Sequence, residues 1–183
     1  MQQSAQQPVQ QSAQQPVQQQ SVQQQAPAKP QTSSQPFTFY DSVLPSAVPA
    51  GQPVATYATG PFAVSPYQVA GHGKVLWIDT NGSDPQASAL DVEPGDATPS
   101  IAAQWAQQRL TAKPTATAII YTTFGEWSQV QAAISTLPSS MQSHVKYWIA
   151  DPNGIPHMVP GASATQWSWG GTYDINTAVP GFF

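Results

Sequence analysis

From residue 37 to residue 183, short runs of apolar residues alternate with small or polar residues that end each run. Runs of this length, bounded by Pro, Gly, Asn or Asp, are typical of β-strands. The pattern predicts seven strands, at residues 37–41, 54–59, 75–79, 87–93, 117–122, 145–151 and 164–169. A short eighth strand is expected at 173–176.

Two segments between these strands have the spacing of amphipathic helices. The first begins at Thr98, which suits an N-cap, with Pro99 at the first helical position, and it ends before Pro114. The second covers 127–137, where apolar residues recur at helical spacing until Pro138 ends the pattern. Alternation of strands and helices predicts parallel strands joined by crossover helices.

The strand count and the character of the runs predict an α/β fold. The runs are continuously apolar, as parallel strands buried on both faces require. Seven or eight such strands predict a shortened (β/α) TIM-like barrel, with an open α/β sheet as the alternative. The barrel is expected to be shortened because TIM barrels usually need roughly 200 residues or more. The early connections are also too short, or too rich in Pro and Gly, for full helices.

The first 36 residues have a different composition and predict a separate region. They are nearly all Gln, Ser, Ala, Val and Pro, and the octapeptide at 2–9 is repeated directly at 10–17. Such a segment cannot bury enough apolar surface to offset the entropy lost on ordering. We therefore expect a disordered Gln/Pro/Ser-rich tail at 1–36 and one barrel domain at 37–183.

Composition excludes several classes of protein. The net charge is −4 and the five Lys and Arg residues are scattered, so no nucleic-acid partner is expected, because phosphate binding needs clustered cations. The absence of cysteine excludes disulfides and a thiolate zinc site. No apolar run reaches the roughly 18 residues of a membrane span. No signal peptide is visible, so an extracellular or virion-associated location would depend on another route, such as lysis.

The most informative motif is the pair Asp91 and Glu93, followed at once by Pro94 and Gly95. Residues i and i+2 of a strand point to the same face, so both acids would project together from the carboxyl end of a strand. The chain has only nine acidic residues, which favours a function for two placed side by side. The alternative is a strand-end turn, with Asp91 bound to backbone N–H groups and Glu93 in solvent.

Further polar and aromatic residues fall at or near strand ends, which open on one face of a parallel barrel. The additional acids are Asp41, Asp79, Asp151 and Asp174, and the expected sugar-binding residues also include Tyr57, Tyr121, Trp148, Gln166 and Trp167. Carboxylates ringed by aromatic side chains suit carbohydrate, and glycoside cleavage needs two carboxyl groups. As alternatives, Asp79 would form a turn bond, and Tyr121 and Trp148 would pack inside the barrel.

Other chemistries have weaker support. His72, His144 and His157 lack the spacing of metal ligands, so neither a metal site nor a cofactor is expected. There is no Gly-x-Ser-x-Gly nucleophile motif.

Several short motifs, in order, resemble one enzyme family. They are Ala-Leu-Asp-Val-Glu (89–93), Ile-Ile-Tyr-Thr (119–122), Tyr-Trp-Ile-Ala-Asp (147–151), Thr-Gln-Trp (165–167) and Tyr-Asp-Ile-Asn (173–176). From about Phe37 to its end, the chain resembles family 25 glycoside hydrolases, the lysozyme-type muramidases, and related glycoside-hydrolase-like domains of actinobacteria and their phages. It is shorter than typical members before residue 87, and 40–43 matches the opening strand only loosely.

The resemblance implies a modified (β/α) barrel that cleaves the β-1,4 bond after N-acetylmuramic acid in peptidoglycan. Glu93 would be the general acid, and Asp91 would stabilise the oxocarbenium or oxazolinium species or position the acetamido group of the substrate. Asp174 and Asp41 would match further acidic positions of the family. The sugar subsites would be lined by Tyr121, Trp148 and Gln166.

Two non-catalytic hypotheses remain open at this point. The first is a glycan- or cell-wall-binding module on a phage virion or tail, displayed on the Gln-rich segment and joined through it to virion partners. The second is a structural virion protein with a vestigial cleft. A rim closed by Trp169 or by residues 182–183 would favour these hypotheses over hydrolysis.

Overall fold

The computed structural model describes Met1 and residues 35–183. The tail predicted at 1–36 therefore lies outside the described residues, apart from Met1 and residues 35–36.

The described chain has mixed α/β content and forms a closed eight-stranded barrel in which neighbouring strands follow sequence order. Its strands are β1 (Phe37–Asp41), β2 (Val54–Tyr57), β3 (Val75–Asp79), β4 (Ala89–Val92), β5 (Ala118–Thr123), β6 (Val145–Ala150), β7 (Ala164–Ser168) and β8 (Asp174–Ala178). All eight predicted strands are present, with ends shifted by a few residues. The alternative of an open sheet is wrong because β8 pairs with β1 and closes the barrel.

Strand direction departs from the prediction at one place. Strands β1 to β7 are parallel, whereas β8 is antiparallel to both neighbours. A parallel crossover needs a dozen or more residues, and only residues 169–173 separate β7 from β8. The hairpin is tight at Gly170, where a Cβ would lie 2.0 Å from the carbonyl oxygen of Tyr173. The expectation of a fully parallel barrel is therefore wrong for β8.

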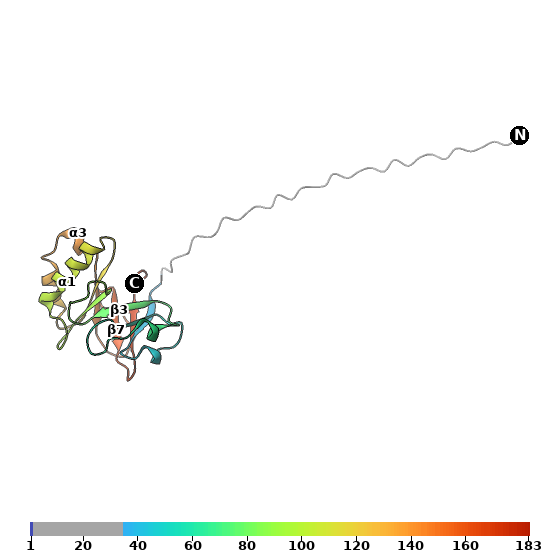
Figure 1. Ribbon diagram of the computed structural model, residues 1–183, viewed down its shortest axis with the longest axis horizontal. Helices are drawn as coiled ribbons and strands as arrows, with labels where there is room; N and C mark the ends of the chain where they lie inside the picture. Colours follow the sequence, from blue (N-terminus) through green and yellow to red (C-terminus); the bar gives the residue numbers. More distant parts are fainter. Residues whose placement is uncertain (2–34) are drawn as a thin grey trace. The chain divides into compact units, whose positions relative to one another are not determined.

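Helices are few and lie together on one side of the barrel (Figure 1). They are α1 (Pro99–Ala112), between β4 and β5, and α2 (Trp127–Ile134) and α3 (Ser139–Gln142), between β5 and β6. Both predicted helices are confirmed, although the second ends earlier and Pro138 precedes α3. Two short 3₁₀ turns, η1 (Pro45–Ala47) and η2 (Pro66–Val69), occupy the connections before β2 and β3. Within the described residues, no helix is long and apolar enough to cross a membrane.

Apolar residues form two cores, one inside the barrel and one beneath the helices. The interior includes Phe39, Leu76, Ile78, Trp148 and Phe182. The second core, between the helices and the outer face of β4 and β5, includes Leu90, Val92, Trp105, Leu110 and Ile120. This double burial explains why β4 is buried at every position and why its sequence run is continuously apolar around a single acid.

The C-terminal aromatic residues fill the end of the barrel at which the parallel strands begin. Phe182 is fully buried and its ring centroid lies 5.6 Å from that of Phe39. Lys74, directly before β3, donates a hydrogen bond of 2.9 Å to the carbonyl oxygen of Phe183. The aromatic terminus therefore seals the end opposite the strand-end acids and leaves their rim open.

Candidate functional site

A cavity of about 450 Å³ opens where the parallel strands end. Eight of the predicted site residues line it: Asp41, Tyr57, Asp91, Glu93, Tyr121, Trp148, Gln166 and Asp174. Trp169, Gly170 and Ile78 complete the lining. The fold thus gathers side chains from all eight strands around one hollow.

Asp91 and Glu93 enter the cavity from the carboxyl end of β4. Asp91 is only 2 % exposed, and its buried Oδ1 has no hydrogen-bond partner among the described residues. Burial raises the pKa of Asp91 well above its usual value, and the charges of Glu93 and Asp96 raise it further. The pKa of Glu93 is raised too, first by burial and then by the charges of Asp96 and Glu126. Both carboxyls therefore hold protons more readily than ordinary acids.

Asp41 and Asp174 face each other across the antiparallel pair of β1 and β8. Burial, with the charge of Asp174 as the next cause, raises the pKa of Asp41 to about 7. Burial also raises the pKa of Asp174, against a lowering effect from the N–H of Gly170, which donates to its Oδ1 at 2.7 Å. At neutral pH the pair is therefore partly protonated, whereas two exposed acids would both be ionised.

Gln166 connects the two sides of the cavity through all its polar atoms. Its Oε1 accepts hydrogen bonds from the hydroxyl of Tyr121 (2.9 Å) and Nε1 of Trp169 (2.7 Å). Its Nε2 donates to Oδ2 of Asp41 (3.0 Å) and, at 3.4 Å, to Oδ2 of Asp174. Because an indole N–H can only donate, Trp169 determines which end of the amide faces the carboxylates.

Trp148 and Asn176 form a second connection to Asp41 beneath the cavity. Nε1 of Trp148 donates to Oδ1 of Asn176 at 2.8 Å, and Nδ2 of Asn176 donates to Oδ2 of Asp41 at 2.7 Å. Trp148 also packs edge-on against Tyr121, with ring centroids 4.8 Å apart. Trp148 therefore packs inside the barrel and also forms the floor of the cavity. These two roles were alternatives in the sequence analysis.

Three predicted site residues do not line the cavity. Asp79 is fully buried, and its carboxylate accepts hydrogen bonds from the hydroxyl of Thr59 and from the N–H groups of Asn81, Gly82 and Asp84. Its role here is the turn after β3, which was the alternative interpretation. Trp167 donates from Nε1 to Oγ1 of Thr177 at 3.1 Å, away from the cavity.

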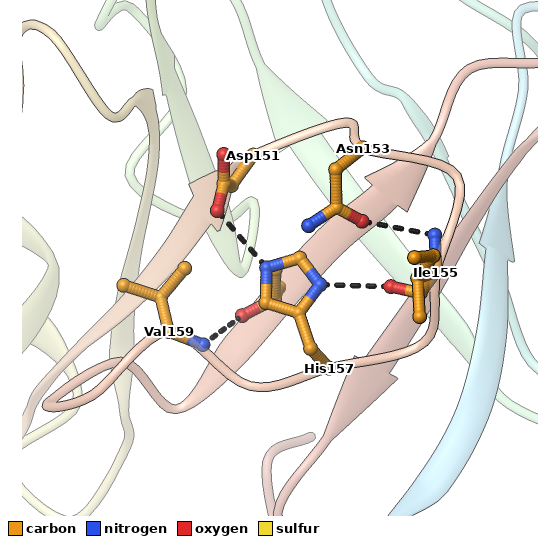
Figure 2. A network of polar contacts seen from close by, with 6 residues as sticks. Asp151, Asn153, Ile155, His157 and Val159 are labelled. Carbon is orange, nitrogen blue, oxygen red and sulfur yellow. Dashed lines mark hydrogen bonds and ion pairs between the residues drawn. The ribbon is translucent and has the colours of Figure 1, made fainter.

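The third, Asp151, lies in a polar network of the loop after β6 (Figure 2). Its Oδ2 lies 3.0 Å from Nε2 of His157, and Nδ1 of His157 lies 2.8 Å from the carbonyl oxygen of Ile155. Acceptors at both ring nitrogens favour the doubly protonated imidazolium. The pKa of His157 is accordingly raised, chiefly by the Ile155 carbonyl and also by Asp151. Asp151 therefore stabilises a loop beside the site.

Sequence analysis did not include four residues that complete the site. Trp169 and Gly170 lie on the hairpin between β7 and β8, and Trp169 was considered only as a residue that could close the rim. Asn176 follows Asp174 by two positions, and this i, i+2 spacing on one strand was a usable signal. Asp96 lies near the β4 pair because Gly95, at φ +107°, turns the chain back.

The resulting site combines acids of raised pKa with aromatic walls. Among the described residues that line the cavity there is no Lys, Arg or His. Trp169 is 64 % exposed and forms part of the wall, and residues 182–183 lie at the opposite end. Such an arrangement can donate a proton to a bound molecule and hydrogen-bond its hydroxyl groups.

No protein family, curated protein or solved structure matches the chain.

Proposed function

We propose that residues 37–183 form a peptidoglycan-directed glycoside hydrolase of the muramidase type, which cleaves β-1,4 bonds by acid catalysis without a cofactor. In this proposal the barrel is a shortened TIM-like barrel related to that of family 25 glycoside hydrolases. The observation that carries the proposal is the acid pair at the end of β4, with raised pKa values, in an open cavity with Tyr and Trp walls. Paired carboxyls are what glycosidic cleavage requires.

Glu93 is the general acid. It is half-buried and lines the cavity, so a substrate can reach its carboxyl group. Its raised pKa keeps a proton available closer to neutral pH. As the bond between the anomeric carbon and the bridging oxygen breaks, the proton of Glu93 passes to that oxygen, which leaves as a hydroxyl. A water molecule then bonds to the anomeric carbon and gives up a proton to the Glu93 carboxylate, which restores the acid.

Asp91 stabilises the positive charge that develops on the sugar ring. Carboxylate oxygens of Asp91, Glu93 and Asp96 lie within 4.8 Å of one another. Two acids so close cannot both ionise without cost, so the pair titrates as a unit and shares a proton at intermediate pH. Of the two, Glu93 is the carboxyl that a substrate can reach directly, because Asp91 is almost entirely buried.

Aromatic side chains around the cavity position the sugar. The pKa values of Tyr57 and Tyr121 are both raised, chiefly by burial and then by the charges of nearby acids. Both phenols therefore stay neutral and offer hydroxyl groups to a bound glycan. Trp169 presents an exposed indole face suited to the apolar face of a sugar ring.

A second candidate is a non-catalytic glycan- or wall-binding module, for example on a phage virion or tail, with virion partners held through the N-terminal segment. The observation that favours it is the 2 % exposure of Asp91, which restricts its contact with a substrate. In either candidate the working location is extracellular or virion-associated.

One experiment separates the candidates. Wild-type protein is incubated with purified peptidoglycan, and the soluble products are analysed by mass spectrometry while the insoluble wall is assayed for bound protein. Soluble fragments with N-acetylmuramic acid at the reducing end support the hydrolase. Saturable binding to the wall without new reducing ends at any pH supports the binding module, and absence of both overturns both candidates.

A further inference from the structure

The turn that follows β4 brings a third carboxylate to the Asp91 and Glu93 pair. The N–H of Asp96 donates to the carbonyl oxygen of Glu93 at 3.0 Å, and the N–H of Ala97 donates to that of Asp91 at 3.2 Å. These two bonds fold the chain back against the end of β4. As a result, Asp91, Glu93 and Asp96 each place one oxygen within 4.8 Å of the other two.

Asp91 supplies an independent sign that the cluster lacks a ligand. Its Oδ1 is buried and accepts no hydrogen bond from the described residues, in a side chain only 2 % exposed. Buried polar atoms are normally satisfied, and leaving a charged one without a partner costs about 1–3 kcal/mol or more. Glu126 also has a buried oxygen without a partner among the described residues, Oε2, and the charge of Glu126 raises the pKa of Glu93.

Among the described residues, no cationic side chain lines the cavity beside these acids. The charges that raise the pKa values of Asp91 and Glu93 are those of other carboxylates, Asp96 and Asp41 among them. An ion bound by all three carboxylates would remove their repulsion and give the orphaned oxygen a partner. Oxygen-only ligands select hard cations such as Ca²⁺ or Mg²⁺.

We propose that Asp91, Glu93 and Asp96 bind one Ca²⁺ ion at the mouth of the cavity. One oxygen of each carboxylate lies within 4.8 Å of the other two, so modest side-chain movement brings all three to one ion. Ca²⁺ accepts several carboxylates in flexible geometry, whereas Mg²⁺ demands near-ideal octahedral geometry and keeps several of its waters. Water completes the coordination on the open side.

Bound Ca²⁺ opposes the chemistry proposed for Glu93. The ion holds all three carboxylates ionised, so it removes the proton that a general acid must donate. This consequence rests on the proposed function, whereas binding of Ca²⁺ does not.

The test measures binding without any substrate. Chelator-treated full-length protein is titrated with CaCl₂ by calorimetry at pH 7.5, alongside the variants Asp96→Asn and Asp84→Asn. Asp84 is a matched control because its Oδ1 accepts a bond from the N–H of Gln86 that Asn can keep, and it lies outside the cavity. We expect one ion bound by the wild type and by Asp84→Asn, and a loss of affinity of about tenfold or more in Asp96→Asn.

Two results would overturn the inference. One is no heat and no rise in Tm for the wild type up to about 10 mM CaCl₂, well above the range of weak extracellular sites. The other is unchanged affinity in an Asp96→Asn variant whose circular dichroism matches the wild type. Wall cleavage in chelator, without Ca²⁺ binding in the titration, removes this inference alone. Ca²⁺ binding together with no wall cleavage in chelator removes the proposed hydrolase alone.

Discussion

Asp41 on β1 and Asp174 on β8 are direct partners across an antiparallel strand pair, and both carboxylates contact Nε2 of Gln166, at 3.0 Å and 3.4 Å. The reversal of β8 produces this pairing, because it brings the first residue of β8 to the rim where the parallel strands end. One amide cannot neutralise two charges. The pair therefore retains a proton, and the stability of the barrel depends on pH.

Stability should fall as pH rises from mildly acidic to alkaline. A folded-state pKa of about 7 for Asp41, against an ordinary value of 3.8, means that the folded state binds more protons between these values. This contribution is complete below pH 3.8 and is lost as pH rises through about 7. The raised pKa values of Asp91, Glu93, Asp96 and Asp174 act in the same direction. We expect Tm to be about 5 °C or more higher at pH 5 than at pH 8.

The variant Asp41→Asn isolates one part of this effect. An Asn side chain can accept the hydrogen bonds of Gln166 and Asn176 through its Oδ1 and carries no charge. Its Tm should change less between pH 5 and pH 8 than that of the wild type, as measured by calorimetry at both pH values. A slope identical to that of the wild type would show that Asp41 is ionised throughout this range.

Asp96→Asn should move the alkaline limb of the pH–rate profile to lower pH. The charge of Asp96 is the largest cause, after burial, of the raised pKa of Glu93. Without that charge, Glu93 loses its proton at a lower pH, so the fraction of enzyme with a protonated Glu93 falls at a lower pH than in the wild type. The measurement is kcat/KM for peptidoglycan solubilisation between pH 4 and pH 9 in chelator, and an unshifted limb would contradict the role given to Glu93.

Trp169→Ala should weaken glycan binding while leaving the fold intact. The side chain is 64 % exposed and lines the cavity, so its removal leaves no void in the core. Aromatic contacts are worth about 0.5–1.5 kcal/mol, which corresponds to a roughly two- to tenfold rise in KM or in the Kd for cell wall. Phe124→Ala is the control, because Phe124 is 59 % exposed and does not line the cavity. Equal effects of both variants would contradict a specific role for Trp169.

Arg109→Met should destabilise the domain without any direct effect on the cavity. Arg109 is 6 % exposed, and its guanidinium donates to the carbonyl oxygens of Thr117 (2.7 Å), Gln86 (3.1 Å), Pro85 (3.2 Å) and Ala87. Met leaves these acceptors without a donor, at an expected cost of about 3 kcal/mol or more. Urea unfolding measures the loss, with the exposed Lys113→Met as control. A difference below about 1 kcal/mol would contradict this structural role.

Apolar periodicity was sufficient to predict every strand and both long helices. It was not sufficient for the direction of β8, because apolar periodicity locates a strand but does not show whether the strand runs parallel or antiparallel to its neighbours. The signal for the reversal was the short connection at 169–173. Asp79 and Asp41 show a second limit. Both residues end a strand. The N–H groups of Asn81 and Gly82 bind the carboxylate of Asp79 in a turn, whereas Asp41 is hydrogen-bonded by side chains such as that of Asn176.

Strand geometry would have improved the prediction for β7. Gln166 and Trp167 are adjacent, and neighbouring residues of a strand point to opposite faces, so both could not line one cavity. The structure places Gln166 inside. The contribution of Asp96 was beyond sequence reasoning, because it depends on how tightly the Pro94–Gly95 turn closes.

The central claim is that Glu93 donates the proton that releases the leaving sugar, and the isosteric variant Glu93→Gln tests it most directly. Wild type and variant are compared for release of reducing ends from purified peptidoglycan at mildly acidic pH, with Asp84→Asn as control and with Tm and wall binding measured in parallel. We predict that Glu93→Gln folds and binds the wall but loses activity by about 100-fold or more, whereas Asp84→Asn retains it. Release of reducing ends by Glu93→Gln at the wild-type rate would contradict the claim.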